Sequence, residues 1–128
     1  MESALHKKIL IVDDVHFVLD LQQQLFGEIQ KELGITLSIK TASNVKKAIE
    51  RLHQDQFDLL ITDMHLPDGT GAEIAEEALA LSSGKTTVVA LTSMPTAFED
   101  KRELFYDFIT KPTDPKQIKE KLTQLVKA

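Results

Sequence analysis

The chain alternates five times between an apolar run suited to a buried strand and a helical pattern, and this alternation restricts its fold more than any other feature. Residues 9–12, 59–61 and 88–91 are continuously apolar, which is typical of strands covered on both faces. Residues 37–41 alternate in polarity and residues 106–110 are short and mixed, which favours more exposed strands. The sequence therefore predicts five strands, three at the centre of a sheet and two at its edges.

Helical patterns follow each predicted strand. The first helix, residues 18–33, has apolar residues at spacings of three and four, and Gly34 can end it in the left-handed conformation. Further helices are expected around residues 45–52, 74–79, 96–99 and 115–125. Because each right-handed crossover between parallel strands passes over the sheet, this order predicts the α/β class: a five-stranded parallel sheet with helices on both faces.

Composition limits the classes of protein that fit. The 128 residues suit one domain, with a core over about residues 7–127, and 42% hydrophobic and 27% charged residues argue against disorder. No membrane span or signal peptide is visible, so we expect a cytoplasmic protein without membrane binding. The absence of cysteine excludes disulfides and thiolate metal sites, and a net charge of -5 argues against direct nucleic-acid binding.

Polar side chains stand where four of the predicted strands end. Asp13 and Asp14 close the first strand, Asp63 the third, Thr92 the fourth, and Lys111 follows the fifth. In an open α/β sheet, ligands bind beyond the carboxyl ends of the strands where the strand order reverses, and the flavodoxin-like order 2-1-3-4-5 puts this point between the first and third strands. We therefore expect the three aspartates to face one another.

Three carboxylates in one cleft repel one another unless a cation lies between them. An all-oxygen ligand set favours a hard ion such as Mg²⁺. Lys111 adds a mobile positive charge, Thr92 adds a hydroxyl donor, and the backbone amides after Asp63 add further donors. This combination suits a tetrahedral anion beside the metal, and a phosphoryl group meets that description.

Each of these residues also has a purely structural interpretation. Asp14 could cap the first helix, and Asp63 could be an ordinary turn acid. Thr92 and Lys111 could be structural or surface residues. Their joint placement at four separate strand ends favours the functional interpretation.

Four motifs make the chain similar, over about its whole length, to the response-regulator receiver domains of two-component signalling, in particular to single-domain receivers like the chemotaxis regulators. They are residues 8–14 (Lys-Ile-Leu-Ile-Val-Asp-Asp), 63–71 (Asp-Met-His-Leu-Pro-Asp-Gly-Thr-Gly), 90–93 (Ala-Leu-Thr-Ser) and 108–112 (Phe-Ile-Thr-Lys-Pro). The resemblance implies a phosphoacceptor signalling domain rather than an enzyme. Such a domain catalyses its own phosphorylation and dephosphorylation.

The resemblance also implies roles for single residues around the acceptor. Asp63 matches the phosphoacceptor, Asp14 a direct Mg²⁺ ligand and Asp13 a ligand that acts through water. His65 matches the residue whose backbone carbonyl binds the metal. The implied donor is a phosphohistidine on a histidine kinase or phosphotransfer protein, and a downstream protein reads the result.

Thr92 and Lys111 match the pair that contacts the phosphoryl group, and Phe108 matches the aromatic switch that turns inward when the threonine moves. An ordinary apolar strand residue is the alternative for Phe108. His65 and Met94 occupy positions that influence the lifetime of the acyl phosphate in the family.

The chain departs from the family between Thr92 and Lys111, where the segment is short. Residues 103–106 replace the small Gly-Ala pair that usually precedes the fifth strand. We therefore expect a truncated or re-angled fourth helix, which affects the usual output face more than the chemistry. The last predicted helix runs almost to Ala128, so no output domain follows if the protein ends there.

Two enzyme or carrier classes fit less well, and two receiver-related alternatives stay open. A phosphohydrolase with an aspartate nucleophile usually has a second acid two residues later, where this chain has His65. A flavin carrier needs a Ser-, Thr- and Gly-rich loop after the first strand, where residues 13–16 would repel phosphate. The open alternatives are an interaction module without phosphate turnover and the receiver part of a longer regulator.

Overall fold

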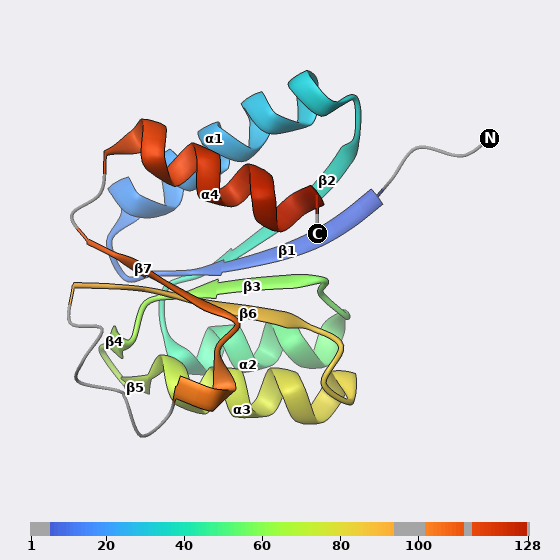
Figure 1. Ribbon diagram of the computed structural model, residues 1–128. Helices are drawn as coiled ribbons and strands as arrows, with labels where there is room; N and C mark the ends of the chain where they lie inside the picture. The colour runs from blue at the N-terminus through green and yellow to red at the C-terminus, as the bar shows by residue number, and fades with distance from the viewer. Residues whose placement is uncertain (1–5, 94–101, 112–113, 128) are drawn as a thin grey trace.

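Strands and helices alternate along the chain in the computed structural model, which describes residues 6–93, 102–111 and 114–127 (Figure 1). The elements are β1 (His6–Val12), α1 (His16–Leu33), β2 (Thr36–Ala42), α2 (Val45–Gln54), β3 (Leu59–Thr62), β4 (His65–Leu66), β5 (Gly69–Thr70), α3 (Gly71–Ser82), β6 (Thr87–Thr92), β7 (Asp107–Thr110) and α4 (Pro115–Lys127).

Five of these strands form one parallel sheet in the order β2-β1-β3-β6-β7. Since β3, β6 and β7 are the third, fourth and fifth strands of this sheet along the chain, the predicted order 2-1-3-4-5 is confirmed. The predicted edge strands are also confirmed, because β2 and β7 lie at the two ends of the order. The short antiparallel hairpin of β4 and β5 was not predicted.

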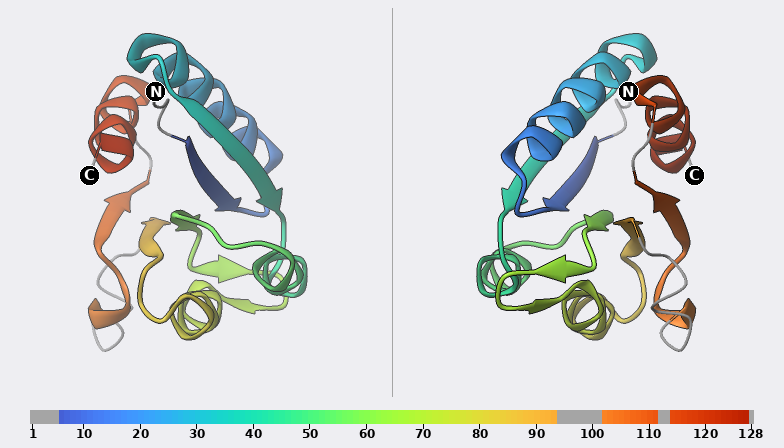
Figure 2. Two further views of the ribbon diagram at one scale, coloured as in Figure 1. Left: turned by 90° about the vertical axis from the view of Figure 1, so that its right-hand side faces the viewer. Right: turned by 90° about the vertical axis from the view of Figure 1, so that its left-hand side faces the viewer.

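Helices cover both faces of the sheet, as expected. Figures 1 and 2 show α1 and α4 on one face and α2 and α3 on the other. Neighbouring residues of β1 point to opposite faces: Ile9 and Ile11 pack under α1 and α4, whereas Leu10 and Val12 pack toward α2 and α3. The continuously apolar runs therefore belong to strands that are buried on both sides.

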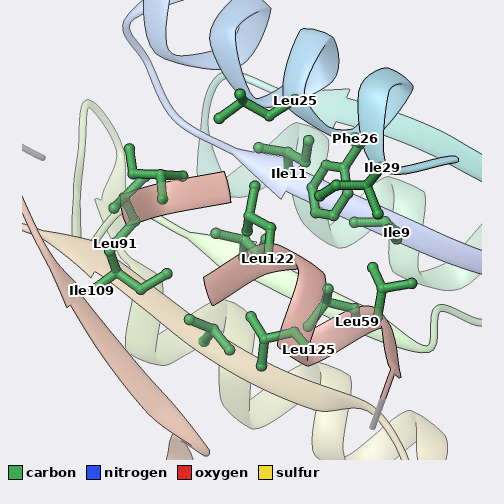
Figure 3. Packing of buried hydrophobic residues seen from close by; sticks show 14 of the residues in the cluster. Ile9, Ile11, Leu25, Phe26, Ile29, Leu59, Leu91, Ile109, Leu122 and Leu125 are labelled. Atoms are coloured by element: carbon green, nitrogen blue, oxygen red, sulfur yellow. The ribbon is translucent and has the colours of Figure 1, made fainter. Parts of the chain in front are cut away.

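The apolar layer under α1 and α4 is shown in Figure 3. Phe26 and Ile29 of α1 and Leu122 of α4 are fully buried, and they pack on Ile11 and Leu91 from the sheet. The predicted burial of the apolar residues of the last helix is confirmed.

Helix ends agree with the sequence at one position and differ at another. Gly34 ends α1 with φ of 65°, and its N–H donates to the Gln30 carbonyl, as predicted. The interpretation of Asp14 as the cap of α1 is wrong, because Val15 occupies the N-cap position and has no side-chain hydrogen bond there. The backbone N–H of Val15 instead donates to Asp13 Oδ1 at 2.9 Å.

The outer edge of β2 is partly occupied by side chains from the two adjacent helices. The backbone N–H of Leu37 donates to Gln30 Oε1 of α1 at 2.7 Å. Arg51 Nε of α2 donates to the carbonyl of Thr41 at 3.3 Å. Leu37 and Thr41 are an even number of positions apart, so the Leu37 amide and the Thr41 carbonyl point to the same side of β2. This is the side that faces away from β1.

The predicted helix at residues 96–99 and Met94 lie outside the described residues. Within the described part, a single 3₁₀ turn at residues 102–104 precedes β7. Among the helices formed by residues 6–93, 102–111 and 114–127, none is both long and apolar enough to cross a membrane.

Candidate functional site

Parallel register brings the ends of β1 and β3 to the same edge of the sheet. Val12 pairs with Thr62, so the residues that follow these two positions leave the sheet side by side. One carboxylate oxygen from each of Asp13, Asp14 and Asp63 lies within 4.8 Å of the others. The predicted meeting of the three aspartates is therefore what the structure shows.

Lys111 points into this acidic cluster from the end of β7. Its Nζ donates to Asp13 Oδ2 at 2.7 Å and lies 3.5 Å from Asp63 Oδ2. Its backbone N–H donates to the Thr92 carbonyl at 2.8 Å, which ties the ends of β6 and β7 together. One ammonium thus faces two carboxylates, and a third lies beside them.

The three acids differ in exposure. Asp13 is completely buried, the Asp63 side chain is 13% exposed, and Asp14 is exposed. Burial raises the pKa of Asp13, while hydrogen bonds from Lys111 and from the Val15 amide oppose this rise. Positive charge beside Asp13, as supplied by Lys111, therefore favours the ionised form of this buried carboxyl group.

The Asp63 carboxylate is oriented by the backbone that follows it. Oδ1 accepts from the amide of Met64 at 2.8 Å and lies 3.4 Å from the amide nitrogen of His65. The other oxygen, Oδ2, is the atom that faces Lys111. One oxygen is thus held by amides while the other is presented to the cleft.

The remaining predicted residues lie around this cluster or next to it. Thr92 is fully buried at the end of β6. His65 is exposed at the start of β4, two residues after Asp63. Phe108 is half-buried in β7, where its ring packs 5.1 Å from that of Phe105 and 5.0 Å from the Arg102 guanidinium carbon.

Asp68 is a residue for which the sequence suggested no role. Its carboxylate accepts hydrogen bonds from the backbone amides of Val45 at 2.7 Å and Lys46 at 3.0 Å, at the start of α2. The link joins residues 22 and 23 positions apart. No local sequence signal could have indicated it, because capping patterns act within one helix turn.

A family model for the response regulator receiver domain matches residues 9–123. The chain belongs to this family. The receiver domain is similar over 117 residues to the response regulator protein PilR of Pseudomonas aeruginosa, at 34% identity. That match covers 89% of this chain and 25% of PilR.

Two further relatives differ in how much of their length this receiver domain spans. Against the chemotaxis protein CheY of Thermotoga maritima, identity is 24%, with 94% of this chain and 98% of CheY covered. Against the probable C4-dicarboxylate response regulator DctR of Priestia megaterium, identity is 29%, with 91% of this chain and 50% of DctR covered. The chain thus spans half of DctR and a quarter of PilR.

Solved structures agree on the fold of this receiver domain. The non-phosphorylated HemR receiver domain of Leptospira biflexa superposes with a TM-score of 0.81 at 24% identity, covering 95% of each chain. The response regulator TrrA of Thermotoga maritima, solved in complex with Mg(2+)-BeF, superposes with a TM-score of 0.72 at 26% identity, covering 93% of this chain and 98% of TrrA.

The acidic cluster of the receiver domain suits a hard divalent cation. Its three carboxylates offer only oxygen ligands, which is the chemistry that Mg²⁺ prefers. Among the described residues, Lys111 is the cation that lies against Asp13 and Asp63, and its one positive charge does not balance three carboxylates. A divalent cation at Asp13, Asp14 and Asp63 would correct this imbalance.

Proposed function

We propose that this receiver domain accepts a phosphoryl group on Asp63 in a Mg²⁺-dependent reaction and passes the event on as a change of shape. The observation that carries the proposal is the cluster of Asp13, Asp14 and Asp63 at the sheet edge with Lys111 Nζ reaching into it. A nucleophilic carboxylate, a cation site and a mobile ammonium are the parts that phosphoryl transfer requires.

The chain's own residues would hold the metal and the phosphoryl group as follows. Asp14 and Asp63 would bind Mg²⁺ directly, Asp13 through water, and His65 through its backbone carbonyl. When bound, Mg²⁺ supplies positive charge that stabilises the phosphoryl oxygens. Lys111 would pair with another phosphoryl oxygen.

Asp63 Oδ2 would attack phosphorus of a phosphohistidine, forming a phosphorus–oxygen bond as the phosphorus–nitrogen bond breaks and the imidazole leaves. With a small acyl phosphate, a phosphorus–oxygen bond breaks and a carboxylate leaves. Water would later attack phosphorus of the aspartyl phosphate and break its bond to Asp63 Oδ2, which restores the carboxylate and releases inorganic phosphate. Because the same site performs both steps, the domain catalyses its own phosphorylation and dephosphorylation by positioning and charge stabilisation.

Thr92 and Phe108 would carry the response. A hydrogen bond from the Thr92 hydroxyl to the phosphoryl group would favour one arrangement of the chain after β6, and Phe108 would follow into the vacated space. The pairing of Ala90 with Phe108 supports this route, because strand alternation puts Thr92 and Ala90 on the same face of β6.

A protein donor is supported by the surface beside Lys111. An apolar pocket of about 340 Å³ lies there, lined by Phe17, Val18, Leu91 and Ile118 among others, and the Phe17 side chain is 74% exposed. We propose a histidine kinase or phosphotransfer protein as donor and a further protein as the target. The proposed setting is the cytoplasm, without direct contact to nucleic acid or membrane.

The unit that performs this function would be one receiver domain with a core over residues 7–127. It can act alone, in line with the 98% of CheY that the chain covers, or as the receiver of a longer regulator, in line with the 25% of PilR that it covers. The alternative is an interaction module without phosphate turnover.

The test is the mass of the protein after incubation with acetyl phosphate and Mg²⁺. We expect the addition of one phosphoryl group, and we expect Asp63→Asn to abolish it because an amide cannot act as the acceptor. The control is Asp58→Asn, since Asp58 is exposed just before β3, at the opposite end of that strand. Undiminished labelling of Asp63→Asn would place the acceptor elsewhere, and an unlabelled, folded wild type would favour the interaction module.

A further inference from the structure

We propose that Asp68 is a positioning residue of the metal site, which acts by fastening the β4–β5 hairpin to α2. This inference rests on the proposed function, because its effect is exerted through the His65 backbone carbonyl. The carboxylate of Asp68 lies at the turn of the hairpin and accepts hydrogen bonds from the first two amides of α2, those of Val45 at 2.7 Å and Lys46 at 3.0 Å.

The base of the hairpin is held at the phosphoacceptor. Asp63 Oδ1 accepts from the amide of Met64, and the amide of Gly71 donates to the Met64 carbonyl at 3.1 Å. A Cβ at position 71 would collide with the Asp63 carbonyl and lie 3.0 Å from Met64 Sδ. The two ends of the hairpin are therefore packed closely against Asp63.

The second strand of the hairpin is held by α3. Thr70 pairs with His65 across the hairpin, and its amide donates to Glu73 Oε2 at 2.8 Å in a capping box. A Cβ at position 69 would collide with the Glu73 carboxylate and lie 3.1 Å from Val45 Cγ2. The hairpin thus fits between α2 and α3 with no free space at Gly69.

Asp68 holds the tip of this hairpin, at the opposite end from its base at Met64 and Gly71. With base and tip both held, the peptide of His65 has a fixed orientation relative to the Asp63 carboxylate. Groups that orient a metal ligand affect affinity although they do not touch the metal. Release of the tip should therefore weaken Mg²⁺ binding.

The structure supplies a matched control for the helix-capping part of this role. Asn44 is the N-cap of α2, and its Oδ1 accepts from the amide of Lys47 at 2.7 Å. Both Asp68→Ala and Asn44→Ala leave amides of the first turn without a partner, but only Asp68 belongs to the hairpin. A comparison of the two separates positioning from capping.

The experiment is a Mg²⁺ titration of the full chain in the absence of any phosphoryl donor, with amide chemical shifts as the measure of binding. We expect Asp68→Ala to weaken Mg²⁺ binding about tenfold, at the low end of the range for groups that orient metal ligands. Asn44→Ala should bind Mg²⁺ with an affinity within about twofold of the wild-type affinity, since this substitution lowers only the stability of the helix. Asp68→Asn should be intermediate, because its single amide oxygen can accept one of the two hydrogen bonds.

Wild-type affinity in both Asp68 variants would overturn the inference while leaving the proposed function intact. An equal loss of affinity in Asn44→Ala would also overturn it, since Asp68 would then act only as a helix cap. A wild-type protein that does not bind Mg²⁺ would overturn the proposed function and this inference together. If Asp68→Ala does not fold, the comparison of Asp68→Asn with Asn44→Ala decides the question by the same criteria.

Discussion

At the scale of single residues, Asp13 shows how the site balances charge. It is completely buried, and burial raises its pKa, whereas the hydrogen bond from Lys111 Nζ and the amide of Val15 favour the charged form. The ammonium of Lys111 is also within 3.5 Å of Asp63. A cation bound beside the acids would free this ammonium to meet an incoming phosphoryl group.

The assignment of direct metal ligands predicts that Asp14→Ala weakens Mg²⁺ binding far more than Asp68→Ala. We expect a loss on the order of 100-fold for Asp14→Ala, because a direct ligand removes both an oxygen and a charge from a site whose ion has few protein contacts. Asp68 lies outside the three-carboxylate cluster found among the described residues. The measurement is a Mg²⁺ titration of both variants, and equal losses would contradict the assignment of Asp14.

At the scale of elements, β6 and β7 connect the site to the aromatic cluster of Phe105 and Phe108. Thr92 pairs with Thr110, and Ala90 pairs with Phe108, so the ring of Phe108 lies two positions from the end of β6. The guanidinium of Arg102 lies over this ring. Movement of Phe108 therefore has to change its contacts with both Phe105 and Arg102.

This arrangement predicts that Thr92→Ala separates phosphorylation from the response. Transfer from acetyl phosphate should continue, because the hydroxyl contributes about 0.5–1.5 kcal/mol net while Mg²⁺ and Lys111 stabilise the charge. The conformational response should decrease strongly, because roughly 1.4 kcal/mol changes a two-state ratio about tenfold.

Amide chemical shifts on addition of beryllofluoride, a phosphoryl mimic, measure the response. In wild type, the residues whose amide shifts change should include β7 and residues 102–104. In Thr92→Ala, the changes should be confined to the surroundings of Asp13 and Asp63. Shifts that spread equally far in the variant would show that Thr92 does not couple the site to Phe108.

The elements also show which parts of the site can be predicted from sequence patterns. Asp13, Asp63 and Thr92 could be singled out because each follows or ends a strand with a clear apolar run, whereas Lys111 follows a short, mixed strand. Parallel register brings the ends of these strands together. The β4–β5 hairpin could not be assigned, because strands of two residues are too short for a periodic pattern. The hydrogen bonds between Asp68 and α2 depend on the position of that hairpin and were missed with it.

At the scale of the whole molecule, one sheet separates two apolar layers. Alternate side chains of the same strands belong to the layer under α1 and α4 and to the layer under α2 and α3. The acids after β1 precede α1, whereas the hairpin after β3 is held by α2 and α3. The site thus joins segments that are anchored in different layers.

The shared sheet predicts that damage to one layer destabilises both. Leu122→Ala should lower the free energy of unfolding by about 2–5 kcal/mol, because Leu122 is fully buried and its loss leaves a cavity. Leu81→Ala is the control, since Leu81 is 42% exposed and should cost less than about 1 kcal/mol. Denaturant unfolding followed by amide signals from both layers should show a single transition, and separate transitions would contradict the prediction.

Sequence patterns predicted the α/β class because long apolar runs and helical spacings are signals that extend over many residues. The strand order was predicted from the flavodoxin-like topology that such sheets commonly adopt. The alternative role of Asp14 as the cap of α1 could not be excluded from the sequence, because Asp is a common N-cap residue, whereas the structure has Val15 at this position. Contacts between residues distant in the sequence were the part that patterns could not provide.

The side chains that occupy the outer edge of β2 have a consequence for encounters between molecules. A strand from another molecule would have to form hydrogen bonds with the Leu37 amide and the Thr41 carbonyl. These two groups are already hydrogen-bonded to the side chains of Gln30 and Arg51. Addition of a strand from another chain would have to displace both side chains and would also meet the exposed charge of Lys40. Intermolecular growth of the sheet, the first step toward fibrous aggregation, is therefore opposed at this edge.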